Sequence, residues 1–299
     1  YAILSTFQSM MADIGIAREN TVIVSGIGCA SRFPYYVDTY GMHSIHGRAP
    51  AIATGVAMSR EDLNVWVVTG DGDALSIGGN HLIHALRRNI NITILLFNNE
   101  IYGLTKGQYS PTSELGKLTK SSPMGSLDRP FDPVTLALGA GATFVARAVD
   151  SDRAGLTSVM RAAAEHRGAA LVEIYQNCPI FNDDAFQLIK DPDTRGEALI
   201  PLTHGEPIRF GADGHLGVFQ DGLGVGVAEV TAENEDRVLV HDAHAEDPSV
   251  AFALSRLSRG SALDRTPIGI FRQIERPSYD DQVRVQVDTA RSAAAPDLQ

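Results

Sequence analysis

The chain of 299 residues has little cysteine, one tryptophan and no long apolar run. Its two cysteines, Cys29 and Cys178, are too few for the disulfide framework that stabilises many small secreted domains. We therefore expect a reducing, cytoplasmic setting. No uninterrupted apolar stretch approaches the roughly 18 residues that a membrane-spanning helix requires, which argues against a membrane protein.

Basic side chains are also fewer than acidic ones. The chain has 25 Lys and Arg against 36 Asp and Glu, a formal net charge of -11. A nucleic-acid-binding face has to neutralise phosphates, so this balance argues against a nucleic-acid partner. Hydrophobic residues make up 44% of the chain, which is ample for a sizeable core and indicates a globular protein.

The chain begins at Tyr1, without an initiator methionine and without the pattern of a signal peptide. Apolar residues recur at helical spacing from Ile3 to Ile14, and Gly15 is a suitable helix stop. Because the first residue already borders this helical pattern, we expect that the sequence lacks its true beginning.

Strand and helix patterns alternate up to about residue 180. Nearly continuous apolar runs, typical of strands buried on both faces, occupy 21–25, 65–69, 92–97, 143–146 and 170–175. Helices are predicted near 51–58, 80–88, 134–139 and 153–167. This order predicts an α/β fold, with a parallel sheet covered by helices on both faces.

The pattern changes after about residue 180. Short strands are predicted at 208–210, 217–219, 225–230 and 237–240, with one helix near 250–256. We therefore expect an α/β domain over residues 1–180 and a smaller α+β extension over 181–299. At the end of the chain, over residues 293–299, we expect a flexible tail.

Two polar motifs follow consecutive strands of the predicted sheet. Gly70-Asp71-Gly72 comes directly after strand 65–69, and Asn98-Asn99 follows strand 92–97. The 25 residues between the motifs accommodate one helix and one strand, which is the content of a crossover between neighbouring parallel strands. Asp71 and Asn99 are then expected side by side at the carboxyl edge of the sheet. A carboxylate, an amide oxygen and backbone carbonyls suit Mg²⁺ bridged to phosphates.

Each motif alone favours an ordinary turn or loop start. Together, at this spacing, they resemble the thiamine diphosphate fingerprint, in which Gly-Asp-Gly precedes Asn-Asn by some 25 residues. The flanking segments 26–32, 46–49, 70–89 and 98–112 resemble the β subunits of 2-oxoacid:ferredoxin oxidoreductases. The resemblance is close over residues 1–186 and looser in the C-terminal part.

The resemblance implies roles for individual residues. Asp71 and Asn99 would bind Mg²⁺ through their side chains, and Ile101 through its carbonyl. His46 would reach the cofactor or the substrate. The residues expected to line thiamine diphosphate are Ile27, Gly28, Cys29, Ala30, His46, Gly47, Arg48, Ala49, Gly72, Asp73, Gly103 and Leu104.

The two cysteines each follow a predicted strand, so both thiols are expected near the carboxyl edge of the sheet. Isolated cysteines are most often structural thiols. The resemblance implies instead that Cys29 and Cys178 are two of the four ligands of a [4Fe–4S] cluster. The other two would belong to a Cys-x-x-Cys-Gly segment that precedes the position of Tyr1, so this chain alone cannot complete the site.

Lys106 bears on the choice of substrate. It lies seven residues after Asn99, and one interpretation is an ordinary solvated loop lysine. In the other interpretation its ammonium group pairs with a second carboxylate of the substrate. The segment 104–108 resembles 2-oxoglutarate enzymes, whereas related pyruvate enzymes carry a small residue at this position.

The resemblance as a whole implies the β subunit of a 2-oxoglutarate:ferredoxin oxidoreductase, working in a heterodimer with an α subunit. Thiamine diphosphate supplies the nucleophile and the electron sink, electrons pass through the cluster to ferredoxin, and coenzyme A accepts the acyl group. The family can also run the reaction in reverse and fix CO₂. Because the glutamate that activates the aminopyrimidine is expected on the α subunit, this chain alone should be catalytically incomplete.

Alternative functions stay open from the sequence. The subunit could act on pyruvate or another 2-oxoacid, or it could belong to a non-redox thiamine diphosphate decarboxylase or synthase. A non-enzymatic binding subunit is a third possibility, disfavoured by the intact Asp71, Gly72 and Asn99. A nicotinamide enzyme is weaker still, because Ser31 replaces the last glycine of a dinucleotide loop in Gly26-x-Gly-x-x-Ser31.

Overall fold

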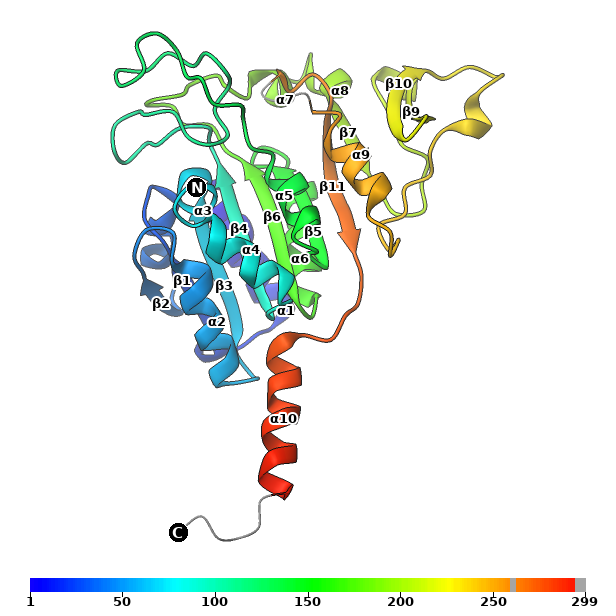
Figure 1. Ribbon diagram of the computed structural model, residues 1–299. Coiled ribbons are helices and arrows are strands. Elements are labelled where there is room, and N and C mark those ends of the chain that lie inside the picture. The colour runs from blue at the N-terminus through cyan, green and yellow to red at the C-terminus, as the bar shows by residue number, and fades with distance from the viewer. Residues whose placement is uncertain (259–261, 294–299) are drawn as a thin grey trace.

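A computed structural model of the chain describes residues 1–258 and 262–293. Its main sheet has eight strands in the order β2-β1-β3-β4-β6-β5-β11-β7 (Figure 1). These strands are β1 (Thr21–Ser25), β2 (Tyr40–His43), β3 (Asn64–Gly70), β4 (Ile92–Asn98), β5 (Phe144–Val149), β6 (Ala169–Tyr175), β7 (Leu199–Leu202) and β11 (Thr266–Gln273). All neighbouring strands are parallel except β5 and β11, which pair antiparallel. The predicted α/β class with a mostly parallel sheet is confirmed.

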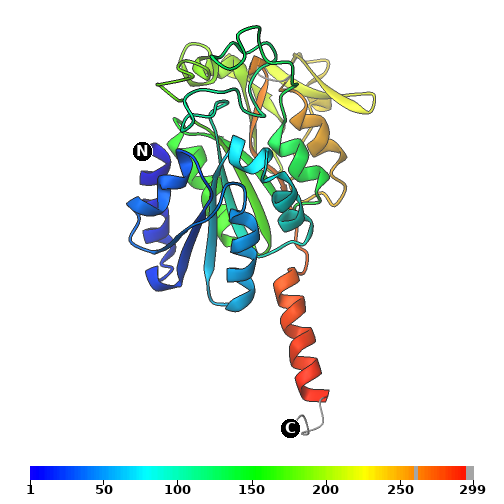
Figure 2. The same ribbon diagram turned by 60° about the vertical axis from the view of Figure 1, so that its left-hand side comes forward.

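Helices cover both faces of this sheet (Figures 1 and 2). Apolar side chains of α2 (Ala49–Ser59), α4 (Gly79–Arg87), α5 (Pro133–Gly139) and α9 (Ser249–Ser255) form one core cluster with the strands. A second cluster joins the other face to α1 (Ala2–Ile14) and α6 (Arg153–Glu165). All seven residues of both β4 and β6 are buried, since the covering helices exclude water from both sides. This explains why the two strands read as continuous apolar runs.

The C-terminal part contains a three-stranded antiparallel sheet of β8 (Arg209–Phe210), β9 (Leu216–Asp221) and β10 (Gly224–Glu229). The strand predicted at 237–240 is wrong. Val238 and Val240 make only isolated bridges, to Phe219 and Pro207, because the 3-10 turn η4 (Glu235–Arg237) immediately precedes them.

Residue 180 does not separate two sheets, because β7 and β11 of the C-terminal part extend the main sheet. The sequence analysis missed three strands of the main sheet, β2, β7 and β11. β2 is an exposed edge strand with no apolar alternation, and β11 contains Pro267 and Gly269, which weaken a strand pattern. Gly269 has a φ of 109°, a conformation that other residues rarely adopt.

The remaining elements are short, apart from the last helix. They are α3 (Asp71–Leu75), α7 (Gln187–Lys190), α8 (Arg195–Ala198) and the 3-10 turns η1 (Arg18–Asn20), η2 (Ala30–Tyr36) and η3 (Ala212–Gly214). Helix α10 (Tyr279–Ala293) extends away from the body in both views (Figures 1 and 2). The tail expected from 293 lies outside the described residues, except for Ala293 itself, which ends α10. None of the described helices combines the length and hydropathy needed to cross a membrane.

Candidate cofactor site

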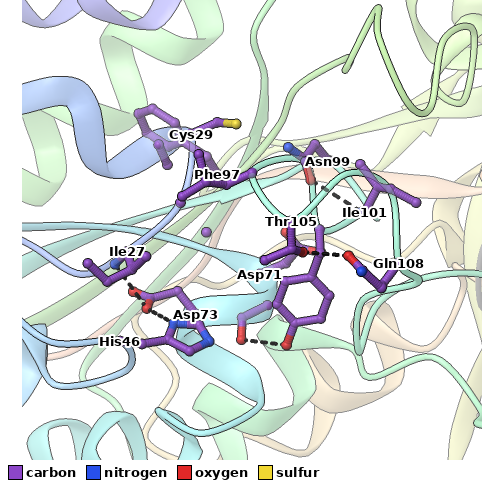
Figure 3. A pocket seen from close by; sticks show the side chains of 17 residues that line it. Ile27, Cys29, His46, Asp71, Asp73, Phe97, Asn99, Ile101, Thr105 and Gln108 are labelled. Carbon is purple, nitrogen blue, oxygen red and sulfur yellow. Dashed lines mark hydrogen bonds and ion pairs between the residues drawn. The ribbon is translucent and has the colours of Figure 1, made fainter. Parts of the chain in front are cut away.

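A pocket of about 430 Å³ lies at the carboxyl edge of β1, β3 and β4 (Figure 3). β3 and β4 are parallel neighbours, as predicted, with Gly70 opposite Phe97, so the motifs that follow them meet at this pocket. The predicted residues that line it are Ile27, Gly28, Cys29, Ala30, His46, Asp71, Gly72, Asp73, Asn99, Ile101, Gly103 and Leu104. The structure therefore brings most of the candidate residues together in one place.

Asp71 is the first residue of α3 and is only 2% exposed. Thr112 Oγ1 donates to its carboxylate Oδ2 over 2.7 Å. Burial raises the pKa of Asp71, and hydrogen bonds from the Ser110 and Thr112 hydroxyls and from backbone groups act against this shift. A buried carboxylate held by hydroxyl and backbone groups, rather than by a cationic side chain, has the chemistry of a ligand for a metal cation.

The turn after β4 adds further oxygen atoms to the pocket. Asn99 Oδ1 accepts a hydrogen bond from the Ile101 nitrogen over 3.2 Å, and Glu100 between them has a φ of 54°. The Ile101 carbonyl accepts no hydrogen bond within the described part of the chain. Burial raises the pKa of Glu100 to about 8, helped by the neighbouring carboxylates of Asp71 and Glu173. The Asn99 amide oxygen and the Ile101 carbonyl, beside the Asp71 carboxylate, are oxygen ligands of the kind that a divalent cation accepts.

Asp73 connects three segments around the pocket. Its Oδ1 accepts hydrogen bonds from the backbone nitrogens of Ile27 (3.2 Å) and Gly47 (2.7 Å), and its Oδ2 accepts one from Thr69 (2.7 Å). His46 Nδ1 lies 2.5 Å from Oδ1, and Figure 3 shows His46 and Ile27 both joined to this carboxylate. Asp73 therefore fixes the loops after β1 and β2 to the edge of the sheet.

Gly72 packs tightly against Tyr102. A Cβ added at Gly72 would lie 2.2 Å from the Tyr102 ring, whose hydroxyl donates to the Gly72 carbonyl over 3.0 Å. Sequence reasoning missed Tyr102 as a pocket residue, together with Phe97, Thr105 and Gln108. Tyr102, Thr105 and Gln108 lie within the segment 98–112, and Phe97 directly precedes it, which was the available signal.

Five other candidates lie outside the pocket lining, and one of them, Cys178, is described below with Cys29. Gly47 binds Asp73 through its backbone, Arg48 Nη1 donates to the Ile77 carbonyl over 3.1 Å, and Ala49 is buried as the first residue of α2. Lys106 is exposed, with a φ of 76°, and lines a second cavity of about 580 Å³. Ile101 lines both cavities, so Lys106 lies next to the pocket rather than within it.

The two cysteines approach each other beside the pocket. A Cβ built on Gly103 would lie 3.2 Å from Cys29 Sγ and 3.9 Å from Cys178 Sγ. Burial raises the pKa of the Cys29 thiol, and the neighbouring Cys178 adds to this effect. Cys29 lines the pocket and Cys178 does not. The convergence of the two thiols that the strand ends predicted is therefore found.

These two thiols are half of the four that a four-cysteine [4Fe–4S] site requires, and the sequence contains no other cysteine. The residues of this chain therefore do not suffice for such a cluster. Across residues 1–258 and 262–293, no three His, Cys, Asp or Glu side chains are grouped so as to hold a metal ion. The site expected for Mg²⁺ does not depend on such a group, because it uses one carboxylate with an amide and a carbonyl oxygen.

Comparison with known proteins identifies the family. Residues 26–174 match the family model described as "Thiamine pyrophosphate enzyme, C-terminal TPP binding domain". The chain is 66% identical to the 2-oxoglutarate oxidoreductase subunit KorB of Mycobacterium tuberculosis, over 98% of this chain and 78% of that protein. It is 42% identical to the 2-oxoacid:ferredoxin oxidoreductase subunit beta of a Sulfolobus species, over 95% of this chain and 83% of that one.

A solved structure gives the same result at the level of the fold. The 2-oxoglutarate:ferredoxin oxidoreductase from Magnetococcus marinus, solved with 2-oxoglutarate, coenzyme A and succinyl-CoA bound, is similar with a TM-score of 0.77. The sequence identity is 33%, and the match covers 99% of this chain and 86% of that one. The chain belongs to the family of KorB-type β subunits of 2-oxoacid:ferredoxin oxidoreductases, as its motifs predicted.

Proposed function

We propose that this chain is the thiamine diphosphate-binding β subunit of a 2-oxoglutarate:ferredoxin oxidoreductase, which converts 2-oxoglutarate and coenzyme A to succinyl-CoA and CO₂ while ferredoxin accepts the electrons that are released. The observation that carries the proposal is the pocket in which Asp71, Gly72 and Asn99 lie together beside Cys29. The names of the relatives support 2-oxoglutarate as the substrate and an α subunit as the partner. The reverse, CO₂-fixing direction belongs to the same proposal.

The cation site of the proposal consists of oxygen ligands from two loops. Asp71 and Asn99 would hold Mg²⁺ through their side chains, and Ile101 through the carbonyl that no other group occupies in the described residues. Gly72, at the start of α3, brings backbone close to the pocket, where a diphosphate can approach it. When bound, thiamine diphosphate supplies the nucleophilic carbon and the electron sink.

His46 is the side chain of this chain best placed to move a proton in the pocket. Its Nδ1 lies against Asp73, which fixes the ring, and its side chain is 38% exposed. Nε2 is then the atom that can donate to or accept from a bound molecule. The pocket walls from Ile27, Phe97 and Leu104 are apolar and would exclude water from the reacting atoms.

Lys106 would select the substrate. 2-Oxoglutarate has a second carboxylate that pyruvate lacks, and the cavity next to the pocket contains Lys106, Lys117 and Lys120. In a chain with a net charge of -11, this local concentration of positive charge favours an anionic group. The second carboxylate would therefore point from the pocket past Ile101 towards Lys106.

Groups outside this sequence would complete the enzyme, some of them from the Cys-x-x-Cys-Gly segment expected before the position of Tyr1 and some from partner proteins. Two further thiolates from outside this sequence would complete a [4Fe–4S] cluster with Cys29 and Cys178, and ferredoxin would be the electron acceptor of the whole enzyme. The α subunit would supply the remaining catalytic groups. The cytoplasmic location expected from the cysteine content stays a prediction.

The test is anaerobic purification of the full-length β subunit with its α subunit. Thiamine diphosphate, magnesium and iron are then quantified, and 2-oxoglutarate- and coenzyme A-dependent reduction of a viologen dye is assayed. Asp71→Ala should abolish cofactor retention, whereas Asp221→Ala, an exposed carboxylate in β9, should not. Bound thiamine diphosphate without dye reduction would instead favour a non-redox enzyme, and absence of the cofactor from the unmutated complex would refute the proposal.

A further inference from the structure

A buried chain of polar side chains runs from the Asp71 carboxylate into the sheet. Thr112 Oγ1 lies 2.7 Å from Asp71 Oδ2 and 2.8 Å from Asn98 Oδ1. Asn98 Nδ2 donates to Glu173 Oε1 over 2.7 Å, and Glu173 Oε2 accepts from Arg147 Nε over 2.7 Å. All five side chains are buried, so water does not compete for these contacts.

The chain of contacts closes on itself through the loop that carries Thr112. Arg147 Nη2 donates to Asp132 Oδ2 over 2.8 Å, and Asp132 caps α5 by accepting from the Thr135 nitrogen. The neighbouring Phe131 nitrogen donates to the Pro111 carbonyl over 2.8 Å. Both ends of the loop 111–131 are thereby attached to one rigid network at the edge of the sheet.

Within this ring, the carboxylate of Glu173 sets the orientation of Asn98. A carboxylate accepts hydrogen bonds only, so the amide nitrogen of Asn98 has to face Glu173, and its oxygen faces Thr112. The Glu100 nitrogen donates to the same amide oxygen over 3.2 Å. The Thr112 hydroxyl has one proton, which is shared between the oxygens of Asn98 and Asp71, and this holds the hydroxyl in one position.

The ion pair at the far end of the ring contributes little net free energy to folding. Arg147 and Glu173 are both 0% exposed, and the desolvation cost of such a pair is comparable to its Coulombic gain. Apolar residues of similar volume would serve packing as well. The pair does, however, give Asn98 and the loop a defined geometry, which apolar side chains cannot do.

We propose that Thr112 is a positioning residue for the cation site, and that the ring of Asn98, Glu173, Arg147 and Asp132 holds it against Asp71. This inference rests on the proposed function, since it assigns the Asp71 carboxylate to Mg²⁺. Mg²⁺ requires near-ideal octahedral geometry, whereas Ca²⁺ tolerates irregular coordination. Loss of positioning therefore weakens Mg²⁺ binding more than Ca²⁺ binding.

The experiment uses the αβ complex, stripped of metal and supplied with saturating thiamine diphosphate. Cofactor retention is measured by equilibrium dialysis against a series of MgCl₂ or CaCl₂ concentrations. Thr112→Val, which keeps the shape but removes the hydroxyl, should weaken the apparent Mg²⁺ affinity about tenfold, the order expected for a lost hydrogen bond to a charged group. The Ca²⁺ affinity should fall by about threefold or less. Thr112→Ser should retain both affinities within about threefold.

Two further variants separate positioning from general destabilisation. Thr93→Val removes another buried hydroxyl from β4, one that donates to the Ala163 carbonyl over 3.3 Å, and should leave the ratio of the two affinities unchanged. Asn98→Ala should lower the ratio of Mg²⁺ affinity to Ca²⁺ affinity, as Thr112→Val does. This second variant keeps the test available if Thr112→Val does not fold. An equal loss of Mg²⁺ and Ca²⁺ affinity, or none, in both variants overturns the inference. Failure of the unmutated complex to need a divalent cation would refute the proposed cation site itself.

Discussion

His46 Nδ1 and Asp73 Oδ1 lie 2.5 Å apart, joining the loop after β2 to the helix turn after β3. The two residues differ in their other hydrogen bonds and in their exposure. Asp73 is 3% exposed and accepts three further hydrogen bonds, whereas the His46 side chain is 38% exposed and faces the pocket. Substitution of the two residues should therefore affect different properties.

Asp73→Ala should lower the free energy of unfolding by about 3 kcal/mol, because it leaves several buried donors without an acceptor. His46→Ala should change it by less than about 1 kcal/mol and lower the turnover of the αβ complex at least tenfold. Urea unfolding and steady-state dye reduction measure the two effects. The same loss of stability in both variants would contradict this division of roles.

Gly72→Ala should remove cofactor binding while leaving the sheet intact. The added Cβ would lie 2.2 Å from the Tyr102 ring, which must then move into the pocket or push α3 away. We expect retention of thiamine diphosphate to fall by tenfold or more in equilibrium dialysis, since the backbone next to Asp71 is displaced.

Gly79→Ala is the matched control for this prediction. Gly79 begins α4, only seven residues further along, and its added Cβ would meet nothing within 4 Å. Its cofactor retention should equal that of the unmutated protein. Normal retention in Gly72→Ala would show that close packing at this glycine is not needed for the site.

The strand ends made much of this site predictable from the sequence. Asp71 and Asn99 end up in one pocket because buried strands are recognisable by composition, and because a strand, helix and strand of this length leave only one compact connection. Cys29 and Cys178 converge beside Gly103 for the same reason. Periodicity and spacing fixed these relationships without any knowledge of side-chain contacts.

The parts that escaped prediction depend on tertiary contacts. β11 joins the main sheet although Pro267 and Gly269 weaken its pattern, because β5 and β7 offer partners on both sides. The ring through Thr112 and Arg147 connects residues from four separate segments, and no local spacing encodes it. Lys106 lines the cavity next to the pocket, and its distance along the chain from Asn99 did not reveal that separate cavity.

His166 makes the stability of the protein depend on pH below neutrality. Burial lowers its pKa from 6.5 to about 4, and its Nε2 lies 2.8 Å from Thr143 Oγ1. The unfolded chain takes up the proton near pH 6.5, whereas the folded protein does so only near pH 4. Neutral His166 therefore costs the folded protein no stability above pH 6.5. As the pH falls from 6.5 towards 4, the free energy of unfolding decreases by about 2 kcal/mol, after allowance for the partial exposure of His166.

The measurement is the urea unfolding free energy between pH 7 and pH 4.5. The histidine pair His166→Gln and His215→Gln provides the comparison, because His215 is an exposed residue outside the main sheet. His166→Gln should flatten the decline in stability, and His215→Gln should not. Parallel curves for His166→Gln and the unmutated protein would contradict the assignment of this pH dependence to His166.

Lys106→Ala should change which 2-oxoacid the αβ complex prefers. If the Lys106 ammonium pairs with the second carboxylate of 2-oxoglutarate, kcat/KM for this substrate should fall at least tenfold, since a charge-assisted hydrogen bond is lost. The value for pyruvate, which has no second carboxylate, should change by less than about threefold. Lys120→Ala is the matched control, because Lys120 lines the same cavity but lies outside the 103–108 segment that borders the pocket. An equal fall of kcat/KM for both substrates would mean that Lys106 supports the structure of its loop. An effect of Lys120→Ala as large as that of Lys106→Ala would mean that the positive charge of the whole cavity selects the substrate.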